Sequence, residues 1–393
     1  MARVLPFVGT RYNPKTAEDL ATVMAPPYDV ITPEMQEHLY NLAPHNFVRL
    51  DLGKEQVDDD EYSNKYQRAA SLLKEWKSSG VLMDDPCKNF YIYQQEFKTP
   101  DKKTHIRTGF FSAVKLEELG KGKIHPHEYT FEAPKEDRLK LLRATHSNLS
   151  SIVYLYSDPE HATDEILNAI TSKEAPRLEI TTEDKVIHRL WLLSNSAKVK
   201  QLSALMQNKE FVIADGHHRY ETAVRYAKEM NRLSTVKKGE SPAYTYTMAF
   251  LVNSCSEGSL ILPTHRVLSA ELGENVDTAE VLEDLEEYFD VTPIKIDVKK
   301  PVAEGTRLME KLESLAKKGT AFVMLLPGGK GYFLTLKPKT DIRSDMPEEL
   351  SDEVAALDVS ILHQYIIARL WVGNPEIELD DKDIFYEKDA AIA

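Results

Sequence analysis

The chain has 393 residues and a formal net charge of −14; 42 % of its residues are hydrophobic and 28 % are charged. This composition is typical of a globular protein and excludes collagen-like, disordered and disulfide-scaffold classes. The acidic balance disfavours broad binding to a nucleic-acid backbone. Because the chain has only two cysteines, Cys87 and Cys255, we expect free thiols in a reducing compartment.

The N-terminal stretch lacks the apolar segment of a secretory signal, and no apolar run reaches the roughly 18–20 residues of a membrane span. We therefore expect a cytoplasmic protein with no membrane partner. The length allows two or three domains. We place a boundary between a region 1–267 and a C-terminal α/β region 268–393, which can share one core.

Helical and strand-like patterns alternate along the chain, which indicates a mixed α/β protein. Helices are predicted at 32–43, 61–78, 162–172, 217–230, 278–289, 303–317 and 358–371. Strands are predicted at 89–97, 106–116, 151–156, 186–193, 211–214, 244–252 and 259–263, with a glycine-turn hairpin at 321–336. The polar stretch 117–150 is expected to be rich in loops, and long irregular loops in compact domains are often functional.

The sharpest local signal is the stretch Phe-Val-Ile-Ala-Asp-Gly-His-His-Arg-Tyr that starts at residue 211. An apolar strand ends at Asp215-Gly216, and a helix begins at once. The unpaired amides and the dipole of a helix N-terminus form an anion site. Arg219 adds a planar fork for phosphate, and His217 and His218 donate hydrogen bonds or titrate near neutral pH. Asp215 is a candidate magnesium ligand. The alternative is a helix start whose polar residues only cap it.

A second signal is His125-Pro-His127-Glu128. In an extended segment, alternate side chains point the same way, so the two histidines have the spacing of a two-ligand metal site. Glu128 is then a candidate base or ligand. The alternative is a solvated loop.

A third signal is Ala-Pro-Pro-Tyr-Asp at residues 25–29. The two prolines make the backbone stiff and extended, so that Tyr28 and Asp29 are presented to their surroundings. Asp29 is a candidate general base. Spacing alone favours a structural turn.

Further along the chain, Thr264, His265 and Arg266 bring a hydroxyl, an imidazole and a guanidinium together after a strand, although they can be purely structural. The sequence 327–331, PGGKG, is interpreted as a hairpin turn. The chain has no GxxxxGK[ST] loop, no GxGxxG after a strand, no HExxH and no CxxC pair, which disfavours the ordinary nucleotide folds.

Two stretches, 214–223 and 25–30, resemble a bacterial and archaeal family of uncharacterised proteins known as DUF1015. The resemblance covers nearly the whole chain. It also includes His127-Glu128, Asp137-Arg138, the segment 263–266 and the segment 357–363.

More distantly, residues 216–220 are similar to the Gly-Cys-His-Arg-Tyr box of sulfiredoxins and the Gly-Glu-Arg-Arg box of ParB nucleotide-binding domains. Their superfamily includes kinases of free L-serine. This similarity implies a ParB/sulfiredoxin-like core with large insertions, in which Gly216, His217, His218 and Arg219 grip phosphate. Because His217 replaces the sulfiredoxin cysteine, sulfinic-acid repair is not available here. A basic helix-turn-helix partner of the ParB kind is also absent from the sequence.

The sequence therefore supports the hypothesis of a nucleotide-dependent kinase that phosphorylates a small hydroxyl metabolite, with free L-serine the leading candidate and Mg²⁺ with ADP or ATP as cofactors. CTP remains open as a donor. Asp29, rather than Glu34 or Glu128, is expected to take the hydroxyl proton. The expected catalytic residues are Asp29, His218 and Glu128, and the expected substrate-binding residues are Thr264, His265, Arg266 and Arg138.

A shared phosphoryl-transfer site requires Asp29 to lie within about 12 Å of Arg219, since the reacting groups meet through bound substrate. Two alternatives stay open. One is a non-catalytic nucleotide or metabolite sensor of the ParB type. The other is a metal-dependent hydrolase that uses His125, His127 and Asp215. The sequence leaves the oligomeric state open.

Overall fold

The computed structural model describes residues 3–16, 19–99, 102–127, 132–233, 241–260, 264–273, 276–348, 350–373, 383–387 and 390–393. The chain forms two compact units, residues 1–260 and 261–393. The described residues contain thirteen α-helices and a large mixed sheet, so the expected mixed α/β class is confirmed. None of the described helices has the length and apolar character that a bilayer span needs.

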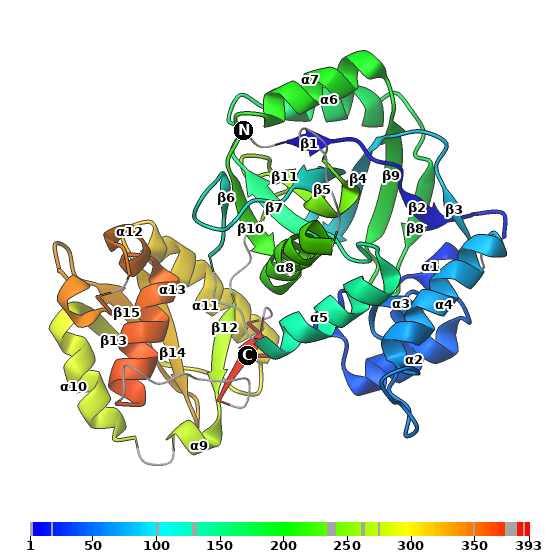
Figure 1. The fold of residues 1–393 in the computed structure, drawn as a ribbon. Helices are drawn as coiled ribbons and strands as arrows, with labels where there is room; N and C mark the ends of the chain where they lie inside the picture. The colour runs from blue at the N-terminus through cyan, green and yellow to red at the C-terminus, as the bar shows by residue number, and fades with distance from the viewer. Residues whose placement is uncertain are drawn as a thin grey trace. The chain divides into compact units, whose positions relative to one another are not determined.

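The first unit is organised around a nine-stranded sheet with the order β6-β10-β7-β11-β5-β4-β9-β8, to which β1 adds beside β5 (Figure 1). The pairs β7–β11 and β6–β10 are parallel, and the other pairs are antiparallel. Its strands are β1 (Val4–Leu5), β4 (Phe90–Lys98), β5 (Thr104–Lys115), β6 (Ile124–His125), β7 (Ile152–Tyr156), β8 (Leu178–Thr181), β9 (Ile187–Leu193), β10 (Phe211–Asp215) and β11 (Tyr246–Asn253).

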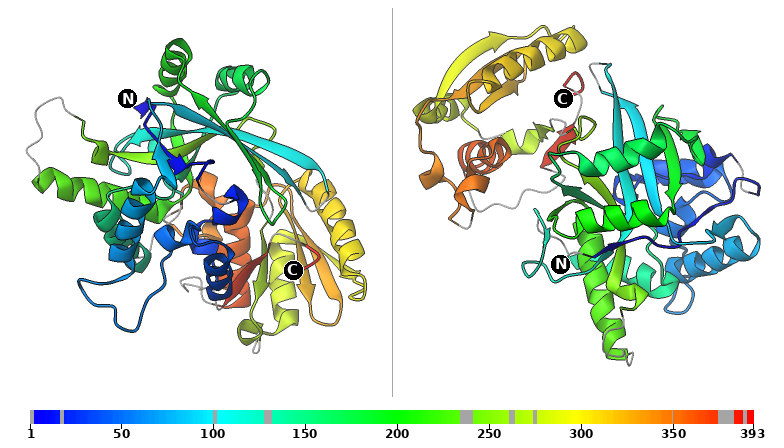
Figure 2. Two further views of the ribbon diagram at one scale, coloured as in Figure 1. Left: turned by 90° about the vertical axis from the view of Figure 1, so that its right-hand side faces the viewer. Right: turned by 90° about the horizontal axis from the view of Figure 1, so that it is seen from above.

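Helices α6 (Ala162–Thr171) and α7 (Ser196–Met206) pack side by side on this sheet (Figure 2). Asn195 caps α7 by accepting hydrogen bonds from two backbone amides of its first turn. The buried side chains that the two helices add to the core are Ile166, Leu167, Ile170, Leu202 and Met206. The sheet side of this core is apolar and aromatic.

A helical layer lies beside the short β2–β3 pair (Thr10–Tyr12 and Leu82–Asp84). It contains α1 (Leu20–Val23), the 3₁₀ turn η1 (Tyr28–Val30), α2 (Pro33–Leu42), α3 (Val48–Asp51) and α4 (Lys65–Ser78). Trp76 of α4 is 2 % exposed and packs with Tyr12, Val23 and Leu50. As expected, α2 begins after Thr32, whose hydroxyl accepts from the Met35 amide at 3.2 Å.

The stretch 117–150 was expected to be rich in loops. The structure instead has β6 and the 14-residue helix α5 (Glu132–Thr145) there. Arg138, Leu141 and Thr145 lie on one face at helical spacing and are each less than 9 % exposed. A charged and a hydroxyl residue thus occupy positions that apolar residues usually fill. These two polar residues on the buried face hide the helical spacing in the sequence.

Helix α8 (His217–Leu233) follows β10 and lies beside α5 (Figure 1). Ion pairs join the two helices, with Arg143 2.7 Å from Glu229 and Lys135 3.2 Å from Glu221. These pairs occur in the same order along both helices, so α5 and α8 run in the same direction. The 3₁₀ turn η2 (Ala243–Thr245) then leads into β11.

The second unit contains a three-stranded antiparallel sheet, β13-β15-β14, and the β12–β16 pair. Its strands are β12 (His265–Leu268), β13 (Phe289–Lys295), β14 (Ala321–Leu326), β15 (Lys330–Leu336) and β16 (Ile384–Glu387). Its helices are α9 (Ala270–Gly273), α10 (Thr278–Tyr288), α11 (Pro301–Ala316), α12 (Asp352–Ala355) and α13 (Asp358–Ser360), with a 3₁₀ turn η3 (Arg343–Asp345). The β14–β15 hairpin turns at Gly328 and Gly329, both of which have positive φ, as the sequence predicts.

Two further elements of the structure differ from the sequence-based expectation. The segment 259–263 was expected to be a strand, but residues 259 and 260 are not in one, and 261–263 lie outside the described residues. The segment 358–371 was expected to be an α-helix, but after α13 it continues as a helix of π geometry, η4 (Ile361–Trp371). The Val372 amide accordingly donates to Ile367 O, five residues earlier. Residues 365–368 are all buried, which is a wider face than an α-helix presents.

Tyr220 ties the start of α8 to the end of β5. Its hydroxyl donates to the Glu117 carbonyl at 2.7 Å and accepts from the Glu117 amide at 3.0 Å, and its side chain is fully buried. We expect Tyr220→Phe to cost about 1–3 kcal/mol of unfolding free energy, because both backbone groups lose their partner. Urea denaturation would measure this. Tyr62→Phe, at a tyrosine that is 84 % exposed, is the matched control, and equal effects of the two changes would contradict the argument.

Candidate active site

The candidate site is built at the turn between β10 and α8. The pairing of β10 with β7 shifts register between Ile213 and Asp215, so the strand becomes irregular just before it ends. Gly216 then has φ +95°, and a Cβ there would lie 3.1 Å from the Arg219 guanidinium carbon. The backbone conformation therefore favours glycine, and the close approach of Arg219 leaves little room for a side chain. Helix α8 begins immediately, and its first intrahelical bond joins the Tyr220 amide to Gly216 O at 2.9 Å.

Arg219 lies folded against this turn, and only 10 % of its side chain is exposed. One terminal nitrogen, Nη2, donates to the Asp215 carboxylate at 2.6 Å. The other, Nη1, donates to the carbonyl oxygen of Ser151, at the start of β7. Its Nε is buried and has no hydrogen-bond partner among the described residues. Arg219 is therefore fixed in place but retains donor capacity.

The N-terminal segment brings a second carboxylate to the same guanidinium. Asp29 Oδ2 lies 4.0 Å from Arg219 Nη2, although the two residues are separated by 190 positions in the chain. Asp29 belongs to the 3₁₀ turn η1, which follows the two prolines. The sequence-based condition that Asp29 lie within about 12 Å of Arg219 is thus met.

Asp29 is in an unfavourable environment for a charge. Burial raises the pKa of its carboxyl, and the neighbouring Asp215 raises it further, while Arg219 opposes both effects. Burial also raises the pKa of the adjacent Tyr28 hydroxyl. The side chains of Asp29 and Asp215 are still 43 % and 50 % exposed, so the two carboxylates lie at a surface that a ligand can reach, beside the mostly buried Arg219.

Arg138 supports this cluster through its contact with Tyr28. Its guanidinium lies 4.0 Å from the ring centroid of Tyr28, and Arg219 lies 5.9 Å from the same centroid. Arg138 is 6 % exposed and donates to the Asp51 carbonyl at 2.8 Å and to the Asp51 carboxylate at 3.1 Å. It also pairs with Asp137. Arg138 therefore positions Tyr28 and, through it, Asp29.

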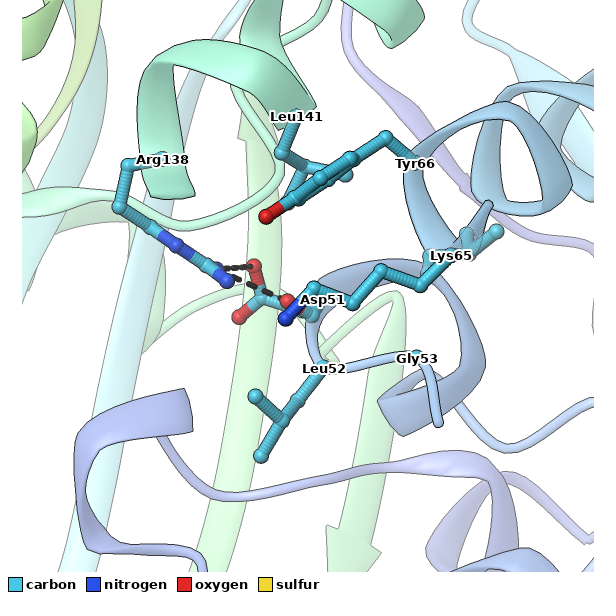
Figure 3. Close-up of a pocket in the computed structure, with 8 residues that line it drawn as sticks. Asp51, Leu52, Gly53, Lys65, Tyr66, Arg138 and Leu141 are labelled. Atoms are coloured by element: carbon cyan, nitrogen blue, oxygen red, sulfur yellow. Dashed lines mark hydrogen bonds and ion pairs between the residues drawn. The ribbon is translucent and has the colours of Figure 1, made fainter. Parts of the chain in front are cut away.

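Figure 3 shows the Arg138–Asp51 contact beside Lys65 and Tyr66 of α4. The Tyr66 hydroxyl donates to Asp137 at 2.8 Å, and Lys65 lies 3.0 Å from the same carboxylate. Burial and this hydrogen bond raise the pKa of Tyr66 to about 12. The cavity in this network has a volume of about 10 Å³, which is room for one water molecule. Arg138 is thus engaged with Asp51 and Asp137 in this network, and its expected role in substrate binding stays a prediction.

The two histidines of the turn also differ from each other. His217 is 2 % exposed, and its Nε2 accepts the backbone amide of His127 at 3.2 Å. The His127 ring packs edge-on against it and donates from Nδ1 to Ile213 O at 2.6 Å. His217 thus fastens the 124–127 segment to the start of α8, and its expected contact with phosphate stays a prediction. His218 is half-buried in the first turn of α8.

The expected metal pair is not arranged as one site. His125 lies 3.2 Å from Glu210, whereas His127 contacts His217 and Ile213 O. Within the described part of the chain, no three His, Cys, Asp or Glu side chains converge to hold a metal. Glu128 lies outside the described residues.

The other candidate base is Glu34, in the first turn of α2. Hydrogen bonds to its own backbone amide and to Thr32 lower its pKa, as for a residue that caps a helix. A lowered pKa makes this carboxylate a weaker base than Asp29.

Thr264, His265 and Arg266 belong to the second unit. Arg266 donates to the Thr264 carbonyl and lies over the Tyr386 ring at 5.2 Å. His265 stands opposite Glu387 in the β12–β16 pair. Burial, followed by the charge of Arg266, lowers the pKa of His363. These residues form a local group of their own within that unit.

The geometry of the turn and of the N-terminal segment accounts for the two stretches on which the sequence resemblance depends. The chain also matches, over residues 4–360, the family described as "Protein of unknown function (DUF1015)". The chain belongs to the DUF1015 family. Among curated proteins and solved structures, no match was found. The likeness of this DUF1015 chain to ParB and sulfiredoxin is therefore not confirmed, and it rests on residues 216–220 alone.

Several residues of the cluster were missed from the sequence. Asp51, Tyr66 and Lys65 come from α3 and α4, and nothing in their local pattern marks them. Ser151 contributes only a backbone oxygen, which no side-chain pattern can reveal. Of these residues, Asp51 alone had a possible signal, since a buried acid at the end of an apolar turn requires a cationic partner.

The raised pKa of Asp29 predicts a pH-dependent stability. Because the folded protein holds this proton more tightly than the unfolded chain does, the unfolding free energy falls as the pH rises above the usual Asp value of 3.8. Asp29→Asn should therefore raise the melting temperature at pH 7, and this gain should disappear below pH 3.8. Thermal melts across pH would measure it, with Asp290→Asn, at an exposed strand residue of the second unit, as control. A loss of stability at pH 7 would contradict the assignment.

Proposed function

We propose that this protein is a nucleotide-dependent phosphotransferase that acts on the hydroxyl group of a small metabolite, with free L-serine as the leading candidate. The observation that carries the proposal is the 4.0 Å approach of Asp29 to Arg219. It brings a candidate proton acceptor to a helix N-terminus that can bind phosphate oxygens. Phosphoryl transfer requires mainly positioning and charge stabilisation, and this site offers both.

The charges of the site favour a metal–phosphate complex over a bare phosphate. Arg219, Asp29 and Asp215 together carry a formal charge of −1 when ionised. Beneath them, Arg138 and Lys65 balance Asp51 and Asp137. Mg²⁺ is commonly bound by one or two carboxylates together with substrate phosphates. Asp215 can supply one such carboxylate, which leaves Asp29 as the proton acceptor, and a bound Mg²⁺ would neutralise charge on the phosphates.

In the proposed reaction, the oxygen of the acceptor hydroxyl bonds to the terminal phosphorus of the nucleotide while Asp29 accepts the hydroxyl proton. The bond from that phosphorus to the bridging oxygen breaks, and the shortened nucleotide leaves with the bonding electrons. Arg219 and the first amides of α8 bind the phosphoryl oxygens. The raised pKa of Asp29 makes it a better proton acceptor than an ordinary surface carboxylate. Asp215 holds Arg219 in position.

The first test is a mass-spectrometric assay of the full chain with Mg²⁺, L-serine and, separately, ADP, ATP or CTP. We expect phosphoserine and the matching shortened nucleotide. Asp29→Asn should lower the rate by about 10²–10⁴-fold, because it removes the proton acceptor. Arg219→Ala should lower it by a similar factor, because it removes the phosphate contact. Arg232→Ala, in the last turn of the same helix, is the matched control and should leave the rate unchanged.

The outcomes separate the alternatives. Nucleotide consumption without phosphoserine would keep the phosphotransferase and replace the acceptor. Tight nucleotide binding without consumption would replace the kinase by a nucleotide sensor. Activity that Arg219→Ala leaves unchanged would remove the proposed phosphate site.

A second test uses the local charge. Wild-type protein should bind ATP at least about fivefold more weakly in EDTA than in Mg²⁺, since two carboxylates repel the uncovered phosphates. Asp215→Asn removes one of these charges and should narrow the difference, mainly through better binding of metal-free ATP. Isothermal titration calorimetry would measure both affinities. Equal affinities with and without metal in the wild type would show that the carboxylates do not face the phosphates.

A further inference from the structure

A larger cavity lies along the same two helices, outside the cluster described above. Its volume is about 300 Å³. The residues that line it come from the end of α5 and the segment that follows it, from α8, from η2 and from the start of β11, and they include His146, Asn148, Tyr226, Tyr244 and Tyr246. This volume lies at the lower end of the range for ligand pockets, and a few polar groups on a largely aromatic wall are typical of such pockets.

The wall is suited to a flat ring with a polar edge. Hydrogen bonds fix two of the tyrosines, since Tyr226 shares one with His146 Nδ1 at 2.7 Å and Tyr244 donates to Asn231 at 3.1 Å. Fixed aromatic rings stack on planar bases at low entropic cost. The Asn148 oxygen accepts from Thr247 at 3.2 Å, which orients the carboxamide of this exposed residue of the cavity wall. A carboxamide is a common reader of a base edge.

The cavity is also aligned with the phosphate end of the proposed site. On α8, the residues Arg219, Ala223, Tyr226 and Met230 follow one another at intervals of four, three and four, and so lie on one face. The last three line the cavity. From Arg219 to Tyr226 the helix rises by about 10 Å, which is the length scale of a nucleotide from its base to its terminal phosphates.

Helix α5 repeats this arrangement. Arg138, which lies over Tyr28, precedes Leu142 by four residues and His146 by eight, and both of these line the cavity. Because the two helices run in the same direction, each leads from a guanidinium beside Tyr28 to the same cavity. A segment of the chain makes a third connection, since Asn148 lines the cavity and Ser151, three residues later, accepts from Arg219.

We propose that this cavity binds the base of the nucleotide whose phosphates bind at Arg219. The inference rests on the proposed function and extends it, because it assigns the base-binding end of the site to tyrosines and an asparagine that no sequence pattern marks. The ligand class is a nucleoside di- or triphosphate bound with Mg²⁺.

The test separates the two ends of the nucleotide by calorimetry on the full chain. The probes are Mg·ATP, Mg·ADP and Mg·CTP, with adenosine as the base alone and Mg·tripolyphosphate as the phosphates alone. Ala243→Trp fills the cavity from an exposed position on η2. It should abolish adenosine binding, weaken Mg·ATP by about tenfold or more and leave Mg·tripolyphosphate unchanged. Arg219→Ala should instead abolish the binding of Mg·tripolyphosphate, weaken that of Mg·ATP and leave adenosine binding unchanged.

Ala204→Trp, at an exposed alanine on α7, is the matched control and should change none of these affinities. Asn148→Ala is a second, smaller change in the cavity and should also weaken Mg·ATP without affecting Mg·tripolyphosphate. If both cavity variants left the nucleotide affinities unchanged, the cavity would not be the base-binding site. The proposed phosphate site would be unaffected by that result. If the wild type bound no nucleotide more tightly than it binds Mg·tripolyphosphate, the cavity would also be excluded as the base-binding site. Absence of all binding would overturn this inference and the proposed function together.

Discussion

Two guanidinium groups lie over the ring of Tyr28, and the candidate site depends on that contact. Arg138 approaches the ring to 4.0 Å and Arg219 to 5.9 Å. The N-terminal turn that carries Asp29 has no strand pairing of its own to the β10–α8 turn, so this stacking holds the two together. Both arginines are at least nine-tenths buried, and buried charges require close partners. Asp51 and Asp137 meet that requirement for Arg138, as Asp215 does for Arg219.

This arrangement explains why the N-terminal helical layer belongs to the site rather than decorating the sheet. Asp51 ends α3, and its two carboxylate oxygens bind Arg138 and Ser150. Ser150 precedes the residue whose carbonyl accepts from Arg219. A single buried carboxylate thus fixes both the arginine under Tyr28 and the strand start beside Arg219. Neutralising Asp51 would leave Arg138 as a buried charge with fewer partners, which is costly in a region of low polarity.

The sequence predicts the sheet well and the site only in part. Strands such as 211–214 and 151–156 are apolar runs bounded by polar turns, and Thr32-Pro33 is a strong helix start, so local patterns suffice for them. Helix α5 was missed because Arg138 and Thr145 occupy its buried face. The turn at 215–219 and the Asp29 segment were found from residue chemistry, whereas their contact across 190 positions depends on packing. His217 is a contrasting example, since its chemistry predicts a phosphate ligand, whereas the fold buries it and lets its ring accept the His127 amide, which no local pattern reveals.

The electrostatics of the cluster connect stability with the proposed activity. Asp29 lies near Asp215, and the fold leaves its charge partly desolvated, as the raised pKa of Asp29 indicates. A protein selected only for stability would place a neutral residue there, because Arg219 is already paired with Asp215 at 2.6 Å. A second carboxylate at an accessible surface, only partly compensated by Arg219, is the feature that a metal–phosphate ligand would satisfy. Helices α5 and α8 then lead from this charged end to the aromatic residues of the larger cavity, so polarity changes along the helices in the order in which it changes along a nucleotide.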